Sequence, residues 1–165
     1  MSLANPRQPG AIVIGLVSDT HGLVRPGVFE ALSGVSQILH AGDVGGRAVL
    51  DELGVIAPVS AVYGNVDHPG PPLEGRHVIE AGGLTLHVSH GHELGSPTPE
   101  KLLATYTADV LVFGHTHRAL VHRSGTRLVI NPGAAGPRRF NAVPSVARLT
   151  ILNGRADVEI VELHA

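Results

Sequence analysis

The chain has 165 residues, of which 43% are hydrophobic and 16% charged, and this balance favours a globular protein over a disordered one. A formal net charge of -2 offers no attraction for bulk nucleic acid. No apolar run approaches the roughly 20 residues that span a bilayer, so no membrane association is expected. The absence of cysteine excludes a disulfide scaffold and a thiolate zinc site and suits a cytoplasmic protein. The 11 histidines are unusual, because histidine is the commonest metal ligand.

The first ten residues contain two prolines and lack the apolar core of a signal peptide, so we expect residues 1–10 to be a disordered lead-in. Residues 11–165 are expected to form a single domain, because a chain of this length can bury one core of ordinary size. The Pro/Gly-rich stretch at 69–75 is interpreted as a connection within that domain.

Short apolar runs alternate with helical segments over the first part of the chain. Strands are predicted at residues 11–17, 37–40 and 58–63, and each ends in a polar turn. Helices are predicted at 26–33, which begins with a proline, and at 46–53; a glycine follows each of them. This alternation is typical of a parallel sheet with crossover helices.

The rest of the chain is richer in predicted strands. A helix is predicted at 97–107, and the pairs Gly82-Gly83 and Asn153-Gly154 are typical of hairpin turns between apolar runs. The remaining predicted strands are residues 77–80, 84–89, 109–113, 119–123, 127–130, 145–152 and 157–163.

Side chains that can bind metals come directly after five of the predicted strands. In an open α/β sheet, ligands bind in the crevice outside the carboxyl ends of the strands. We therefore expect these five side chains to converge on one place: Asp19, Asp43, Asn65, His90 and His115.

His115 and His117 form the strongest single motif, because two histidines two residues apart point to the same side of an extended chain. Both are therefore expected to face one metal cluster. Asp19 and His21 alone would also fit a turn with a helix cap, and the other ligand-type residues alone would fit ordinary turns. Their combination in this order favours a shared site.

Carboxylate, amide and imidazole ligands suit Mn²⁺, Fe²⁺, Zn²⁺, Ni²⁺ or Co²⁺ better than Ca²⁺, which prefers an all-oxygen shell. Seven ligands are too many for one tetrahedral ion, so two ions are implied. Two such ions can clamp the attacking and leaving oxygens of a phosphoryl displacement and acidify a water between them. The predicted ligands are Asp19, His21, Asp43, Asn65, His90, His115 and His117.

Five motifs in fixed order carry a family resemblance: Asp19-x-His21, Gly42-Asp43, Gly64-Asn65-x-Asp67, His90-Gly91-His92 and Gly114-His115-x-His117. The series resembles the calcineurin-like metallophosphoesterases over roughly residues 11–160. It looks closest to their small bacterial and archaeal phosphodiesterase branch, which shares its fold with the retromer subunit. The resemblance implies an α/β fold of the α+β kind, a four-layer α-β-β-α sandwich of two mixed β-sheets flanked by helices.

The resemblance also implies how the ligands divide between the two ions. One ion would be held by Asp19, His21 and His117, and the other by Asn65, His90 and His115, with Asp43 bridging them. It implies two divalent cations, with Mn²⁺ the first candidate and Ni²⁺, Fe²⁺, Zn²⁺, Mg²⁺ and Co²⁺ left open. The implied reaction is attack of a metal-bridging hydroxide on a phosphate ester.

The chain departs from many larger relatives at Val66, where those relatives carry a histidine thought to assist the leaving group. His92 and His68 are the nearby candidates for that task, and we expect His92 to lie close to the substrate phosphate; a supporting or surface position for His92 is the alternative. Asn65 and His92 are thus the expected catalytic residues. His40 and Asp67 are expected to support the ligands from behind.

Three function classes compete. A phosphodiesterase acting on a small phosphate ester is favoured, because every expected ligand position is filled. A catalytically weak scaffold or binding protein of the same fold is the alternative, but a scaffold needs no complete cage. A zinc amidohydrolase is disfavoured because the chain is too short for the barrel of those enzymes. The substrate is left open, as is a homodimer or higher homo-oligomer.

Overall fold

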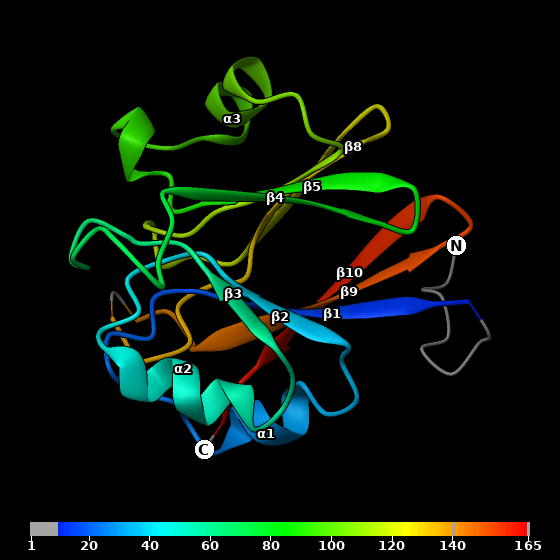
Figure 1. Cartoon of the computed structure of the whole chain (residues 1–165). Coiled ribbons are helices and arrows are strands. Elements are labelled where there is room, and N and C mark those ends of the chain that lie inside the picture. The colour runs from blue at the N-terminus through cyan, green and yellow to red at the C-terminus, as the bar shows by residue number, and fades with distance from the viewer. Residues whose placement is uncertain (1–9, 140, 165) are drawn as a thin grey trace.

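The computed structural model describes residues 10–139 and 141–164, so all but the last residue of the predicted lead-in lies outside the described part. Within these residues, two five-stranded sheets pack face to face. Helices α1 (Gly27–Ala31) and α2 (Arg47–Gly54) cover one sheet, and α3 (Pro99–Thr105) covers the other (Figure 1). The four-layer sandwich that the family resemblance implied is confirmed.

The first sheet is mixed. Its central strands β1 and β2 are parallel, as are β2 and β3, whereas β9 lies antiparallel to both β1 and β10. In spatial order it contains β10 (Arg155–Glu162), β9 (Ser145–Leu152), β1 (Ile12–Val17), β2 (Gln37–His40) and β3 (Val59–Ala61).

The second sheet is also mixed, with parallel pairs at β5–β6 and β6–β8 and antiparallel pairs at both edges. In spatial order it contains β4 (Arg76–Ala81), β5 (Leu84–Ser89), β6 (Val110–Val112), β8 (Arg127–Asn131) and β7 (Leu120–Ser124). A short 3₁₀ helix, η1 (His92–Leu94), follows β5.

Apolar side chains fill the spaces between all four layers, which explains why β1 is apolar throughout. Ile14 and Leu16 face the core between the two sheets, and Val13 and Val17 face the helices α1 and α2. On the outer face of the second sheet, Phe113 packs with Leu102 of α3. No helix in the described ranges is long and apolar enough to cross a membrane.

Helices α1 and α3 are shorter than predicted, whereas α2 has the predicted length and is shifted by one residue. Helix α3 begins at Pro99 instead of residue 97, because the Thr98 hydroxyl accepts a hydrogen bond from the Lys101 N–H at 3.2 Å and caps the helix there. Helix α1 ends at Ala31, two residues early, since Leu32 leaves the helical conformation and is fully buried. The Asn-Gly hairpin is confirmed: Asn153 (φ 54°) precedes Gly154 (φ 73°), and β10 starts directly after them.

Candidate metal centre

Five loops meet where strands of both sheets end. The Asp19 N–H donates to the Gly42 carbonyl at 3.0 Å, and the Gly114 N–H donates to the His90 carbonyl at 3.0 Å. Gly114 is required at this crossing, because a Cβ there would collide with the Ser18 hydroxyl. The loops thereby bring together all seven side chains that the sequence nominates as ligands.

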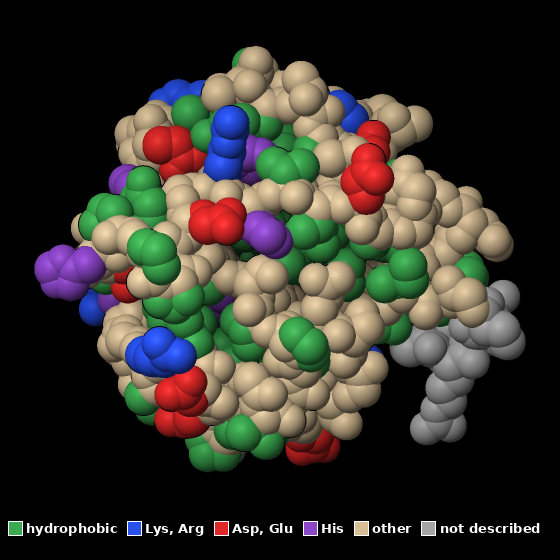
Figure 2. Space-filling model, viewed as in Figure 1, with side chains coloured by type: hydrophobic (Ala, Val, Ile, Leu, Met, Phe, Trp, Pro, Cys, Tyr) green, Lys and Arg blue, Asp and Glu red, His purple; other side chains and the backbone are tan. Residues whose placement is uncertain are grey.

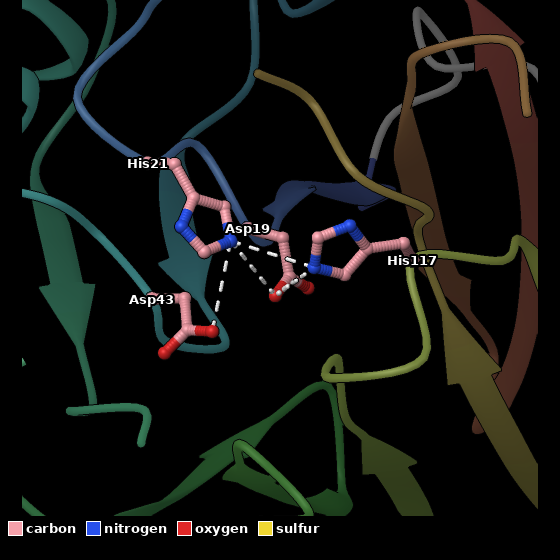
Figure 3. Close-up of side chains that lie close together, drawn as sticks. All are labelled: Asp19, His21, Asp43 and His117. Atoms are coloured by element: carbon pink, nitrogen blue, oxygen red, sulfur yellow. Dashed lines mark hydrogen bonds and ion pairs between the residues drawn. The ribbon is translucent and has the colours of Figure 1, made fainter. Parts of the chain in front are cut away.

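Four of these side chains form the first half of the cluster (Figure 3). Asp19, His21, Asp43 and His117 each offer one ligand atom, and these atoms all lie within 4.8 Å of one another. Asp19 Oδ1 lies 3.3 Å from His117 Nε2 and 3.8 Å from His21 Nε2. The two histidine Nε2 atoms face each other at 3.4 Å. Such a set of two carboxylates and two imidazoles suits a divalent transition metal.

The second half of the cluster is centred on the Asn65 side-chain oxygen. Asn65 Oδ1 lies 3.0 Å from His90 Nε2 and 3.1 Å from His115 Nδ1. The rings of His90 and His115 stand edge to face, with centroids 5.2 Å apart. Asn65 is exposed whereas His90 is fully buried, so this half reaches from the core to the surface.

Asp43 lies between the two halves. Its Oδ2 is 3.6 Å from His21 Nε2 in the first half and 3.3 Å from His90 Nε2 in the second. Its other oxygen, Oδ1, accepts a hydrogen bond from the Val66 N–H at 3.1 Å, which holds the carboxylate in this orientation. One carboxylate oxygen is therefore within reach of both ligand sets.

Five of the seven candidate ligands adopt the left-handed backbone conformation, which costs a non-glycine residue on the order of 1 kcal/mol. They are Asp19 (φ 53°), His21 (φ 44°), Asp43 (φ 54°), His115 (φ 71°) and His117 (φ 63°). Strained conformations of this kind persist only where contacts with the surrounding structure hold them in place, and they are concentrated at functional sites.

This conformation corrects the premise of an extended backbone for the His-x-His motif, although both rings reach the cluster. His115 and His117 are not in an extended segment, so the alternation rule of a strand does not apply to them. His115 turns toward Asn65 and His117 toward Asp19, which places the two rings in different halves of the cluster. The pair is shared between the two ligand sets instead of pointing together.

The cluster has the electrostatic features of a cation site. Asp19 Oδ1 is buried and has no hydrogen-bond partner among the described residues. His90 Nδ1 is 2.8 Å from the Ala41 carbonyl and must donate to it, so in the neutral ring Nε2 presents a lone pair to the oxygens of Asp43 and Asn65. A proton on His90 Nε2 or a bound cation is needed between these facing acceptors, and a metal ion would take the place of that proton.

The pKa directions of His21, His115 and Asp43 agree with ligand chemistry, whereas that of His90 favours the protonated ring in the absence of a metal. Burial lowers the pKa of His21 and of His115, which favours the neutral imidazole that binds metals. For Asp43, burial acts upward, but hydrogen bonding to His90 and the Val66 N–H lower its pKa to about 2. For His90, burial acts downward, but hydrogen bonding to Asp43 and the charge of Asp19 raise its pKa above the usual value.

His40 holds two of the ligand loops without touching the cluster itself. Its Nδ1 accepts from the Gly42 N–H at 3.1 Å, so Nε2 donates to the Thr20 hydroxyl at 2.9 Å. That hydroxyl in turn donates to the Val44 carbonyl at 2.8 Å. The fully buried ring therefore links the Asp19–His21 turn to the Asp43 turn.

Asp67 and Asn131 hold the remaining loops. The Asp67 carboxylate accepts the N–H groups of Val44, Gly45 and Gly64, and so fastens the turn of Asn65 to that of Asp43. The Asn131 amide donates to the Gly114 carbonyl and to the Thr116 hydroxyl, and thereby supports the His115–His117 turn. Sequence reasoning did not find this role of Asn131, although its position at the end of a buried strand was the available signal.

The buried His40 predicts a pH effect on folding. Burial lowers its pKa to about 4 from 6.5, so below pH 6.5 the unfolded chain takes up a proton that the folded chain does not. Stability from this group is fully present above pH 6.5, and about 3 kcal/mol is lost by pH 4. Urea unfolding of chelator-treated protein should show a weaker pH dependence between pH 6.5 and 4 for His40→Asn than for the wild type. Parallel curves would contradict the assignment.

His92 lies beside the second half of the cluster. Its ring centroid is 5.3 Å from that of His90, and its Nδ1 is buried without a hydrogen-bond partner among the described residues. The Glu93 carboxylate fixes the preceding turn by accepting the Gly91 N–H at 2.9 Å and the Tyr106 hydroxyl at 2.7 Å. The ring of His92 also borders a cavity of about 350 Å³.

Residues 12–154 match the calcineurin-like phosphoesterase superfamily domain, and the chain belongs to that family. The family uses divalent metals, and the cluster described above is a site of the expected kind.

Two curated relatives and one solved structure extend the match. A probable metallophosphoesterase of Methanothermobacter thermautotrophicus is 32% identical over 93% of this chain and 94% of the relative. A phosphodiesterase of Methanocaldococcus jannaschii is 29% identical over 73% of this chain and 82% of the relative. The crystal structure of Vps29 from Chaetomium thermophilum superposes with a TM-score of 0.77 at 25% identity, covering 92% of this chain and 97% of that one.

Proposed function

We propose that this protein is a dinuclear metal-dependent phosphoesterase that hydrolyses phosphodiesters. The observation that carries the proposal is the position of Asp43 Oδ2, within 3.6 Å of His21 Nε2 and 3.3 Å of His90 Nε2. A single carboxylate between two ligand sets suits two neighbouring cations. When bound, such cations supply Lewis-acid polarisation of the phosphate and an acidified water at neutral pH.

The side chains of the protein supply the positioning. Asp19, His21 and His117 would hold one cation, and Asn65, His90 and His115 the other, with Asp43 shared between them. His40, Asp67 and Asn131 keep the ligand loops in register through their backbone hydrogen bonds. Positioning within a few tenths of an ångström is what separates an active site from a mere cluster of ligands.

His92 is proposed to face the substrate phosphate and to serve the leaving group. Glu93 holds the turn that precedes it, and His92 stands next to His90 on the side of the cluster that opens to the surface at Asn65. The side chain of Val66 cannot carry a proton, and it is exposed. Esters with poor leaving groups therefore require a proton donor other than residue 66, and His92 is the side chain proposed for this task.

A catalytically weak scaffold or binding protein of the same fold is the competing function, and the similarity to Vps29 gives it weight. The complete set of ligands favours the enzyme, because a scaffold has no use for five left-handed residues that converge on one point. Mn²⁺ is proposed as the native ion. The cytoplasmic location and a homo-oligomeric state stay predictions.

Metal removal tests the proposal directly. Protein stripped with a chelator should not hydrolyse bis(4-nitrophenyl) phosphate, and reloading with Mn²⁺ should restore turnover, because the cations supply both the nucleophile and the charge compensation. Ni²⁺, Mg²⁺ and Zn²⁺ serve as comparison ions, and 4-nitrophenyl phosphate serves as the monoester comparison. Activity that persists after complete metal removal would contradict the mechanism, and equal or better turnover of the monoester would contradict the diester preference.

A further inference from the structure

A cavity of about 440 Å³ is lined by residues that follow two of the candidate ligands in the sequence, among them Val44 after Asp43 and Val66 after Asn65. It is bounded by the β3–β4 loop on one side and by the start of α2 on the other; in Figure 1 that loop projects at the left, above α2. In the space-filling view, hydrophobic side chains are exposed over the same region (Figure 2). Its apolar lining consists of Val44, Leu50, Val66, Pro71, Pro72 and Leu73.

The cavity and the metal centre share their walls. Val66 lines the cavity with its side chain, while its N–H donates to Asp43 Oδ1 at 3.1 Å. Asp67 binds the N–H groups of Val44 and Gly64 at 3.0 and 2.9 Å, so one carboxylate joins both walls. One ester substituent of a phosphate at the metal centre would therefore reach this cavity. The shared hydrogen bonds also fix the position of the cavity relative to the metal centre.

The chemistry of the lining points to a flat ring as the occupant. Proline rings and valine or leucine side chains offer apolar faces, and the exposed Arg47 and His68 can stack on an aromatic ring. The acidic side chain of the cavity, Asp67, accepts hydrogen bonds from three N–H groups, which partly offset its negative charge. A volume of about 440 Å³ is in the range of pockets that hold small organic ligands.

We infer that this cavity, which we name the ring pocket, binds an aromatic substituent of the phosphodiester, of the size of a nucleoside. The inference rests on the proposed function, because it assigns the substituent of the ester that the metal centre would hydrolyse. It narrows the substrate class from phosphodiesters in general to those with at least one aryl or nucleoside group.

Binding of two monophosphates tests the inference without any turnover. Calorimetry on the Mn²⁺-treated protein compares thymidine 5′-phosphate with methyl phosphate, which presents the same anionic group without a ring. We expect the thymidine compound to bind at least about tenfold more tightly, a modest part of what a buried ring contributes. Equal affinities would overturn the inference and would instead leave the cavity as a surface for a peptide or a second copy of the chain.

A variant whose side chain fills the ring pocket provides a second measurement of the same two affinities. Val66 is 56% exposed, so Val66→Trp can place its ring in the cavity without disturbing the core, and the ratio of the two affinities should fall to about 1. Val55→Trp, at the other end of α2 and 79% exposed, is the matched control and should keep the wild-type ratio. A ratio that Val66→Trp leaves unchanged would overturn the inference. Failure of the proposed function would appear separately, as absent metal-dependent hydrolysis.

Discussion

Replacing Asp43 by Asn should abolish both the binding of a second ion and most of the activity. The amide keeps an acceptor for the Val66 N–H but removes the negative charge between His21 and His90. We expect turnover of bis(4-nitrophenyl) phosphate to fall about a thousandfold or more, equivalent to about 4 kcal/mol of transition-state stabilisation. Metal analysis of the purified variant should find at most one ion per chain.

The matched control for this variant is Asp51→Asn. Asp51 lies on α2, its side chain is 71% exposed, and its ion partner is Arg47 at 3.9 Å, so it carries the same charge close in the sequence without reaching the cluster. This control should retain wild-type metal content and turnover. Retention of two ions by Asp43→Asn would show that Asp43 does not bridge them. Equal losses in the two variants would point to a general effect of charge.

Removing the ring of His92 should slow only those esters whose leaving group needs a proton. General acid catalysis typically contributes about a hundredfold or more, so His92→Ala should lose about that factor on an alkyl diester. Its turnover of a 4-nitrophenyl diester should change far less, because that leaving group departs as a stable anion. The measurement is the ratio of kcat values for the two esters.

His68→Ala is the comparison variant, since His68 is the other histidine near Val66, and it is exposed in the ring pocket. It should leave the ratio of kcat values at the wild-type level, and any loss of stacking in the ring pocket should appear in the KM of the aryl ester instead. A ratio that shifts in His68→Ala and not in His92→Ala would transfer the role to His68. An equal loss on both esters in His92→Ala would assign His92 to holding the substrate instead of donating a proton.

The positions of buried strands such as β1 and β6 could be predicted because each lies in an apolar run bounded by a glycine or a polar turn, whereas the edge strand β4 mixes polar and apolar residues. The run at β1 is apolar at every position since both of its faces are covered, with Ile14 toward one core and Val13 toward the other. The lateral order of the strands could not be read the same way. The pairing of β1 with β9, for example, joins Leu16 to Ala147, and no local signal links residues so far apart.

The ligands could be nominated because they follow strand ends, whereas their division between two halves depends on backbone conformation. His115 and His117 show the difference: the spacing suggested one direction, and φ values of 71° and 63° send the rings to different sides. The role of Asn131 in holding the His115–His117 turn could not be predicted from local sequence either, because its amide reaches Gly114 and Thr116 across the fold. Local sequence indicates which side chains can bind, and tertiary contacts decide where they point.

The left-handed residues also bear on how members of this fold would lose their metals. Asp, Asn and His tolerate this conformation better than most residues, and Gly tolerates it best. A descendant that no longer needed ions would therefore be expected to replace Asp19 or His117 by Gly or Asn, and to avoid valine or isoleucine at either position. The loop conformation would be kept after metal binding was lost. The residue types at these positions would then distinguish a former metal site from a loop that never bound a metal.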